Sequence, residues 1–196
     1  MDYLIADEAL LERMVRAVEK VRDRLKRAAA ALEGAGIPYA VAGGNAVAAW
    51  VATIDESAVR NTRDVDIVLR RNDLPAAKKA LEAAGFIYRH VKSIDMFLDG
   101  PEAKARDAVH VLFAGEKVKS EDLEAVPDVD QPFVTNNVKF LPLPTLVAMK
   151  LTSFRDKDRT HLRDMIDVGL IDDTWQQNLA PDLAMRFKQL LDNPGG

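Results

Sequence analysis

Two aspartates one residue apart begin an apolar run in the middle of the chain, Asp64-Val65-Asp66-Ile67-Val68-Leu69. Side chains alternate across a β-strand, so a strand over this run puts both carboxylates on one face. The three apolar residues that follow are typical of a buried strand. Two carboxylates at the mouth of such a strand repel each other unless a positive charge lies beside them. A fold that buries this strand therefore has to supply that charge.

Two sources of that charge fit the sequence. Mg²⁺ takes oxygen ligands and is commonly held by one or two carboxylates together with substrate phosphates. Alternatively, the aspartates form salt bridges at a solvent-facing strand end with Arg63, Arg70 or Arg71. The aspartates alone fit both interpretations equally well. The buried strand that follows them favours a metal site, because two carboxylates next to a buried strand are unfavourable without a neutralising charge.

A glycine pair follows an earlier predicted strand, over residues 37–42. Gly43-Gly44-Asn45 comes next, and an Ala-rich buried helix is predicted over 46–54. Glycines at a strand–helix junction let backbone N–H groups approach a phosphate, and a helix N-terminus adds about half a positive charge. Glycine is also required in turns for steric reasons alone. Phosphate binding and a plain turn therefore both remain open here.

The first predicted helix runs over 7–33, with Asp7 as its cap and Gly34 and Gly36 at its end. One face carries apolar residues at helical spacing: Leu11, Met14, Val18, Val21, Leu25, Ala28 and Leu32. The other face carries basic residues: Arg13, Arg16, Lys20, Arg24 and Arg27. We interpret it as the solvated face of an amphipathic helix, with binding to an acidic partner as the alternative.

The order of the remaining elements predicts the fold class. We expect a loop over 55–63, a helix from Asn72 or Asp73 to 84, strands over 86–91, 96–98 and 108–113, an acidic loop over 114–132, an edge strand over 138–141, and helices over 143–154, 156–170 and 174–191. This order predicts a single α/β (α+β) domain over 1–196, with a mixed β-sheet flanked by helices. Its core covers about 37–141 and its C-terminal helical part about 142–192, while 193–196 should fray.

Composition excludes several classes of protein. The chain has 196 residues, 48% of them hydrophobic and 30% charged, which suits one globular domain. The formal charge of −4 gives no general basic field for nucleic acid, and the lack of cysteine excludes disulfides, zinc fingers and thiol nucleophiles. The N-terminus does not resemble a signal peptide, and the apolar stretch 39–54 is too short and too interrupted to span a membrane. We therefore expect a cytoplasmic protein without a membrane partner.

Three motifs, taken in order, resemble the nucleotidyltransferase superfamily that contains DNA polymerase β. They are Ala42-Gly43-Gly44, then Arg60-x-Thr62-x-Asp64-Val65-Asp66-Ile67, and then Leu146-x-x-Met149-Lys150-Leu151 with Arg155-Asp156-Lys157-Asp158 and Leu162-Arg163-Asp164. The third motif is similar in particular to the AbiEii-like toxin branch and its small bacterial relatives. The resemblance covers roughly residues 37–167.

The resemblance implies a nucleotide site and a cofactor. Asp64 and Asp66 would carry Mg²⁺ or Mn²⁺ against the phosphates of a nucleoside triphosphate. The nucleotide would contact the glycine turn and the later helix pair through Gly43, Gly44, Asn45, Lys150, Arg155, Lys157 and Asp158. For Lys150 and Arg155, salt bridges and surface charges remain the alternative.

The sequence departs from the superfamily at the third catalytic carboxylate, which relatives carry on a later strand. The strand over 108–113 offers His110 there, while Asp107 lies three residues away and thus on the opposite face. An imidazole can act as a ligand or a base, although Mg²⁺ prefers oxygen, and a packed histidine is the alternative. His161 likewise occupies a position where relatives often have an acid.

We therefore expect a metal-dependent nucleotidyltransferase that moves a nucleoside monophosphate from a triphosphate to a hydroxyl of RNA such as tRNA, of a protein or of a small molecule. The alternatives are a non-catalytic module of the same fold that binds a nucleotide or a protein, and a toxin–antitoxin component that acts by protein contact. The presence of Asp64 and Asp66 favours the enzyme, in which His110 would be the third catalytic residue. The replacement of an acid by His110 favours the alternatives.

Overall fold

Seven strands form one mixed sheet in the computed structural model, which describes residues 2–193. The strand order is β3-β4-β5-β2-β1-β7-β6. Strand β2 runs parallel to β5 and β1 parallel to β7, while the other neighbours are antiparallel. The strands are β1 (Tyr39–Ala42), β2 (Val65–Leu69), β3 (Ile87–Val91), β4 (Ile94–Leu98), β5 (Val109–Phe113), β6 (Phe133–Thr135) and β7 (Val138–Phe140).

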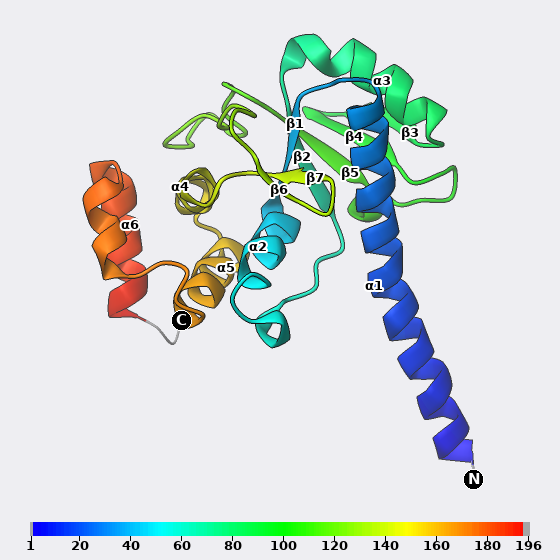
Figure 1. Ribbon diagram of the computed structural model, residues 1–196, viewed down its shortest axis with the longest axis horizontal. Helices are drawn as coiled ribbons and strands as arrows, with labels where there is room; N and C mark the ends of the chain where they lie inside the picture. The colour runs from blue at the N-terminus through cyan, green and yellow to red at the C-terminus, as the bar shows by residue number, and fades with distance from the viewer. Residues whose placement is uncertain (1, 194–196) are drawn as a thin grey trace.

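Helices cover both faces of this sheet. One face carries α1 and α3, and the other carries α2 with α4 and α5, while α6 packs outside α4 (Figure 1). The helices are α1 (Asp2–Gly34), α2 (Gly43–Val51), α3 (Leu74–Ala83), α4 (Leu143–Ser153), α5 (Asp156–Asp167) and α6 (Pro181–Asp192). Among the helices of residues 2–193, none has the length and apolar composition that a membrane crossing requires. The expected mixed sheet with flanking helices is thus confirmed.

The middle of the sheet is buried because β2 lies between β1 and β5. Val65 and Ile67 on one face of β2 are at most 1% exposed, and so is Val68 on the other face. A strand covered on both faces reads as a nearly continuous apolar run, which explains the sequence of β2. Asp66 is the polar exception, on the face that α2 covers.

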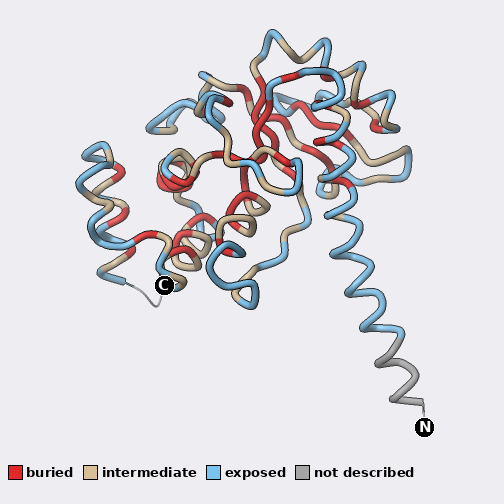
Figure 2. Tube along the Cα trace, in the orientation of Figure 1, coloured by how far each residue is buried: buried red, intermediate tan, exposed pale blue. Residues whose placement is uncertain are grey.

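The first helix differs from its prediction in two ways. It begins at Asp2, so the expected start with Asp7 as its cap is wrong. Only the C-terminal half of its apolar stripe packs on the sheet: Ala28 and Leu32 are buried, whereas Leu11 is 61% exposed. The N-terminal half projects away from the rest of the molecule (Figures 1 and 2).

Three smaller differences concern element boundaries. Helix α2 begins at Gly43 instead of Ala46, so the glycine pair belongs to its first turn. The short strand β6 was not predicted, and because it forms the edge of the sheet, the expectation of an edge strand over 138–141 is wrong. The last predicted helix is two elements, a 3₁₀ segment over Asp173–Asn178 and then α6, because Pro181 lacks a backbone N–H and therefore starts a new helix. Of the expected frayed end, residues 194–196 lie outside the described residues.

We expect Phe187→Ala in α6 to lower the free energy of unfolding by about 3–5 kcal/mol, because Phe187 is fully buried and its removal leaves a cavity. Urea unfolding followed by circular dichroism measures this change. The matched control is Met185→Ala on the same helix, where a side chain that is 71% exposed should change stability by less than about 0.5 kcal/mol. Equal effects of the two substitutions would show that α6 does not pack as described.

Candidate functional site

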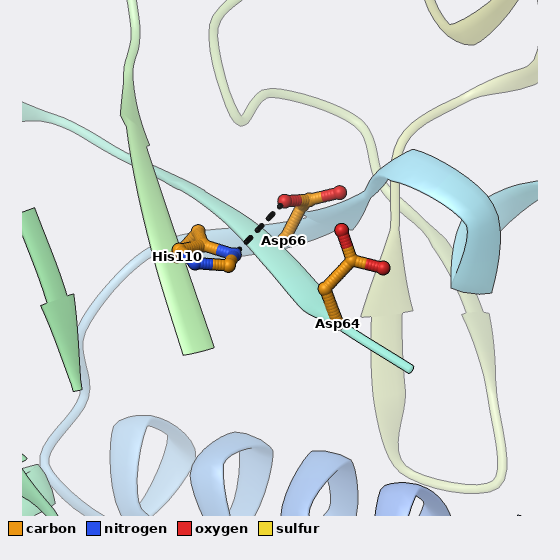
Figure 3. A group of neighbouring side chains, drawn as sticks. All are labelled: Asp64, Asp66 and His110. Carbon is orange, nitrogen blue, oxygen red and sulfur yellow. Dashed lines mark ion pairs between the residues drawn. The ribbon is translucent and has the colours of Figure 1, made fainter. Parts of the chain in front are cut away.

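Asp64, Asp66 and His110 come together at one end of β2 (Figure 3). The parallel pairing of β2 with β5 puts Asp66 directly beside His110. His110 Nδ1 lies 3.7 Å from Asp66 Oδ1, and one ligand atom from each of the three residues lies within 4.8 Å of the others. Each side chain is partly exposed, between 19% and 29%. The three residues therefore offer two oxygens and one nitrogen to a shared point.

Asp64 is held in place by contacts on three sides. The Thr62 hydroxyl donates to Asp64 Oδ1 at 2.8 Å, and the Asn45 amide Nδ2 donates to the Asp64 carbonyl at 2.8 Å. Lys157 from α5 brings its Nζ to 3.6 Å from Asp64 Oδ2. Elements far apart in the chain thus converge on Asp64, because α2 contacts its backbone carbonyl and α5 contacts its carboxylate.

The glycine pair is required by close packing against the same cluster. Gly43 follows Ala42, which pairs with Asp66 across the antiparallel β1–β2 ladder. A Cβ atom at Gly43 would overlap the Asp66 carboxylate, and one at Gly44 would lie 3.0 Å from Thr62. Gly43 also has φ +63°, a conformation that favours glycine. The N-terminus of α2 therefore abuts the Asp66 carboxylate.

The two aspartates differ in their pKa values. Burial and the nearby charge of Asp64 raise the pKa of Asp66, and this rise is only partly opposed by His110, Lys150 and Lys157. Burial also acts to raise the pKa of Asp64, but the Thr62 hydroxyl and Lys157 outweigh it and lower that pKa overall. Asp64 is thus stabilised as a carboxylate by its neighbours. Asp66 lacks sufficient positive charge beside it.

Two of the three arginines that offered a salt-bridge explanation, Arg70 and Arg71, are engaged elsewhere. Arg70 pairs with Asp128 and Asp130, each at 2.8 Å, and Arg71 pairs with Glu116 at 2.5 Å. The interpretation that Arg70 or Arg71 neutralises the aspartates is therefore wrong. The basic groups that reach the pair come from β5 and α5.

Asp158 anchors the α4–α5 turn. Its carboxylate accepts hydrogen bonds from Lys150 Nζ at 2.9 Å, Ser153 Oγ at 2.6 Å and Arg155 Nε at 2.7 Å. Although burial acts to raise its pKa, Lys150 and these hydrogen bonds hold the pKa of Asp158 well below its usual range. It is fully buried and therefore not itself open to a bound nucleotide. Its carboxylate instead orients Lys150 and Arg155.

The three predicted cationic residues, Lys150, Arg155 and Lys157, differ in how exposed their side chains are. Lys150 is 5% exposed and already paired with Asp158, yet its charge acts on Asp66. Arg155 keeps 53% of its side chain exposed and Lys157 keeps 51%. Lys157 and Arg155 therefore have cationic ends that are accessible to a bound anion. Lys150 is buried and acts on Asp66 only through its charge.

Two further features were not predicted, an ion pair of Arg60 and the buried environment of His161. Arg60 makes a bidentate ion pair with Asp164 of α5, at 2.9 and 2.8 Å, and so ties the 55–63 loop beside the site. His161, on the same helix, has a buried Nδ1 without a partner among the described residues. Burial and Lys150 lower the pKa of His161 to about 4, so it is neutral at pH 7. The spacing of Lys157, His161 and Asp164 on one helical face was the signal available in the sequence.

Comparison with known proteins identifies the family. A family model described as an uncharacterised nucleotidyltransferase matches residues 8–130, which is more than half of the chain. No curated protein matches the chain. The superfamily part of the resemblance is thus confirmed, while the AbiEii-like branch and a toxin–antitoxin role stay predictions.

Two solved structures have a similar fold. One is a putative nucleotidyltransferase from H. pylori, 14% identical with a TM-score of 0.52 over 90% of this chain and 77% of that chain. The other is the antibiotic-resistance factor ANT(2'')-Ia in solution, 11% identical with a TM-score of 0.50 over 93% of each chain. Identities this low show the fold alone. Together with the family match, they lead to one conclusion: the chain belongs to the family of uncharacterised nucleotidyltransferases.

Proposed function

We propose that this protein is a metal-dependent nucleotidyltransferase that moves a nucleoside monophosphate from a triphosphate to a hydroxyl acceptor. The observation that carries the proposal is the cluster of Asp64, Asp66 and His110, whose ligand atoms lie within 4.8 Å of one another beside the N-terminus of α2. The acceptor in this proposal is a hydroxyl of RNA, of a protein or of a small molecule. We also propose that residues 1–196 form one domain.

The residues of the cluster fit a divalent cation. Two carboxylates and an imidazole match the ligands of Mn²⁺, and the carboxylates match those of Mg²⁺. Burial and Asp64 raise the pKa of Asp66 by more than His110, Lys150 and Lys157 lower it, so a bound cation would supply the positive charge that these neighbours do not. Asp64 and Asp66 would hold the ion, with His110 as a further ligand. When bound, the ion neutralises charge on the phosphate oxygens.

The chain's own groups would hold the triphosphate around this position. The backbone N–H groups at the start of α2, at Gly43 and Gly44, suit phosphate oxygens because a helix N-terminus leaves such donors unpaired. Lys157 and Arg155 have exposed cationic ends on α5 and at its start. Phosphoryl chemistry depends mainly on positioning and on charge neutralisation, so these groups suffice to orient the nucleotide.

His110 leaves a second candidate function open. By the resemblance to the superfamily, His110 would take the place of the third carboxylate, and an imidazole brings no negative charge to a second metal or to the attacking hydroxyl. A module that binds a nucleotide without transferring it is therefore the alternative. The two candidates share the nucleotide site and differ in turnover.

Asp64→Asn combined with Asp66→Asn should abolish magnesium-dependent binding of ATP and GTP, because the cation loses both carboxylates. Calorimetry should give about −4 to −8 kcal/mol for the wild type, in the millimolar to micromolar range, and no measurable heat for the variant. The melting temperature should not fall, since the variant also removes repulsion and the poorly compensated Asp66. Asp107→Asn, which changes an acid 3.7 Å from Arg106 and outside the cluster, is the control. Equal binding by variant and wild type would rule out this site.

Lys157→Ala should weaken triphosphate binding by roughly tenfold, equivalent to about 1.4 kcal/mol, and weaken monophosphate binding less. The melting temperature should stay unchanged because half of the Lys157 side chain is exposed. Lys150→Ala, in contrast, should destabilise the fold, since it leaves the Asp158 carboxylate buried without its lysine. The matched control is Lys188→Ala, which removes a lysine that pairs with Asp192 on α6. A similar loss for Lys157→Ala and the control would contradict the proposed phosphate contact.

His110→Asp should create or raise transferase activity with Mg²⁺ while nucleotide affinity changes by no more than a few fold. A positioned base commonly contributes about 10² to 10⁴ in rate, and an added carboxylate also supplies a ligand that Mg²⁺ prefers. Labelled triphosphates with mixed tRNA and with the protein itself provide the assay. The wild type should work better with Mn²⁺, which accepts nitrogen more readily.

The control for this substitution is His110→Asn, which keeps a similar size without adding charge and should not raise activity. Rapid turnover of the wild type with Mg²⁺, together with a loss of rate in His110→Asp, would contradict the assigned role of His110.

A further inference from the structure

The loop over residues 55–63, which leads from α2 into Asp64, has little buried surface. Most of its residues are exposed, and the rest are only partly buried. A loop with few buried apolar contacts opens locally at a low cost in free energy. The path of the chain next to Asp64 therefore depends on polar contacts with other elements.

Two such contacts anchor the loop on either side of Thr62. Arg60 donates from Nε and Nη2 to the Asp164 carboxylate, at 2.9 and 2.8 Å. Three residues later, the carbonyl of Arg63 accepts a hydrogen bond from Arg24 Nη1 at 3.0 Å. Arg24 belongs to α1 and Asp164 belongs to α5, and these helices cover opposite faces of the sheet (Figure 1). Thr62 is thus held between anchors that come from both faces.

Thr62 connects this anchored segment to the metal cluster. Its hydroxyl donates to Asp64 Oδ1 at 2.8 Å. Its side chain also packs so closely on Gly44 that a Cβ atom at Gly44 would lie 3.0 Å from it. A shift of the segment would therefore move the hydroxyl away from Asp64 or press Thr62 against the start of α2.

The ion pair of Arg60 and Asp164 has the geometry of a positioning contact. Exposed ion pairs contribute little to stability, and Arg60 is 61% exposed. Asp164, however, is only 11% exposed, and its two oxygens accept two N–H groups of one planar guanidinium. A bidentate contact of this kind fixes distance and direction together. The pair therefore bears on the geometry of the loop more than on the stability of the fold.

Helix α5 is connected to both oxygens of the Asp64 carboxylate. Lys157 brings its Nζ to 3.6 Å from Asp64 Oδ2, and Asp164 lies two turns later on the same helical face. Arg60 and Thr62 connect Asp164 to the other oxygen, Oδ1. One helix thus contacts one oxygen directly and the other through the loop.

We propose that Arg60 and Asp164 are positioning residues for the metal site. Their ion pair fixes Thr62, and Thr62 in turn fixes the Asp64 carboxylate in the orientation that a cation requires. This inference rests on the proposed function, because it takes Asp64 as a ligand of the cation. Groups that orient metal ligands commonly change metal affinity by about 10- to 100-fold.

Binding of Mn²⁺ to the full chain without nucleotide tests the proposal, and electron paramagnetic resonance measures the free ion directly. Arg60→Gln should weaken Mn²⁺ binding about tenfold, because the loop loses its anchor on α5. By charge alone, the removal of a positive group near a cation site would strengthen binding, so the direction of the change separates positioning from electrostatics. Asp164→Asn should weaken binding at least as much. The melting temperature of Arg60→Gln should stay unchanged, because its ion pair is largely exposed.

The matched control is Glu116→Gln, which removes the bidentate partner of Arg71 at the opposite end of β2 from Asp64. It should leave Mn²⁺ affinity unchanged. The double variant Arg60→Gln with Thr62→Val tests the route of the effect. Because the ion pair acts through Thr62, the double variant should bind Mn²⁺ no more weakly than Thr62→Val alone.

The outcomes separate this inference from the proposed function. A wild type that binds no Mn²⁺ would contradict the metal site itself, and the positioning role with it. A wild type that binds Mn²⁺, with Arg60→Gln binding equally or more tightly, would overturn the positioning role alone. Additive losses of affinity in the double variant would overturn the route through Thr62.

Discussion

The approach of the Gly43 backbone to the Asp66 carboxylate is the contact around which this end of the molecule is arranged. It exists because β1 runs antiparallel to β2 and ends at Ala42, opposite Asp66, so that the chain has to turn into α2 at that level. A side chain at Gly43 would overlap the carboxylate. Only a glycine therefore lets the N-terminus of a helix and an acid on the neighbouring strand share this space. The same turn brings Asn45 onto the backbone of Asp64.

The charges around this contact are divided between two layers. Asp64, Asp66 and His110 lie at the open side, with Lys157 near Asp64. Behind them, the buried carboxylate of Asp158 holds Lys150 and Arg155 by direct hydrogen bonds. Moving any partner away from this buried carboxylate would leave a desolvated charge without compensation. This cost keeps Lys150 and Arg155 in fixed positions. Asp158 therefore fixes the positions of Lys150 and Arg155 relative to the aspartates.

Much of this arrangement follows from local patterns. The apolar runs over 37–42 and 64–69 predict β1 and β2, and strand alternation predicts that Asp64 and Asp66 share a face. Alternation cannot say which strand lies beside β2, so the pairing of Asp66 with His110 depends on the topology of the whole sheet. The superfamily resemblance pointed to His110, whereas spacing alone did not.

Other features depend on contacts that no local pattern encodes. Arg155-Asp156-Lys157-Asp158 reads as an exposed start of a helix, and the burial of Asp158 depends on Lys150 in the preceding helix. The stripe of α1 predicts a buried face along the whole helix. The sequence does not reveal that the sheet is too short to cover Leu11 and Met14, since the extent of a sheet is set by elements far along the chain.

The position of a bound cation shows whether Asp64 and Asp66 form a metal site. Crystals grown with Mn²⁺ and a non-hydrolysable triphosphate allow the metal to be located by anomalous diffraction. We expect a peak between Asp64 and Asp66, with the triphosphate directed toward the start of α2. A triphosphate bound elsewhere, or a peak away from both aspartates, would show that these residues do not form the metal site.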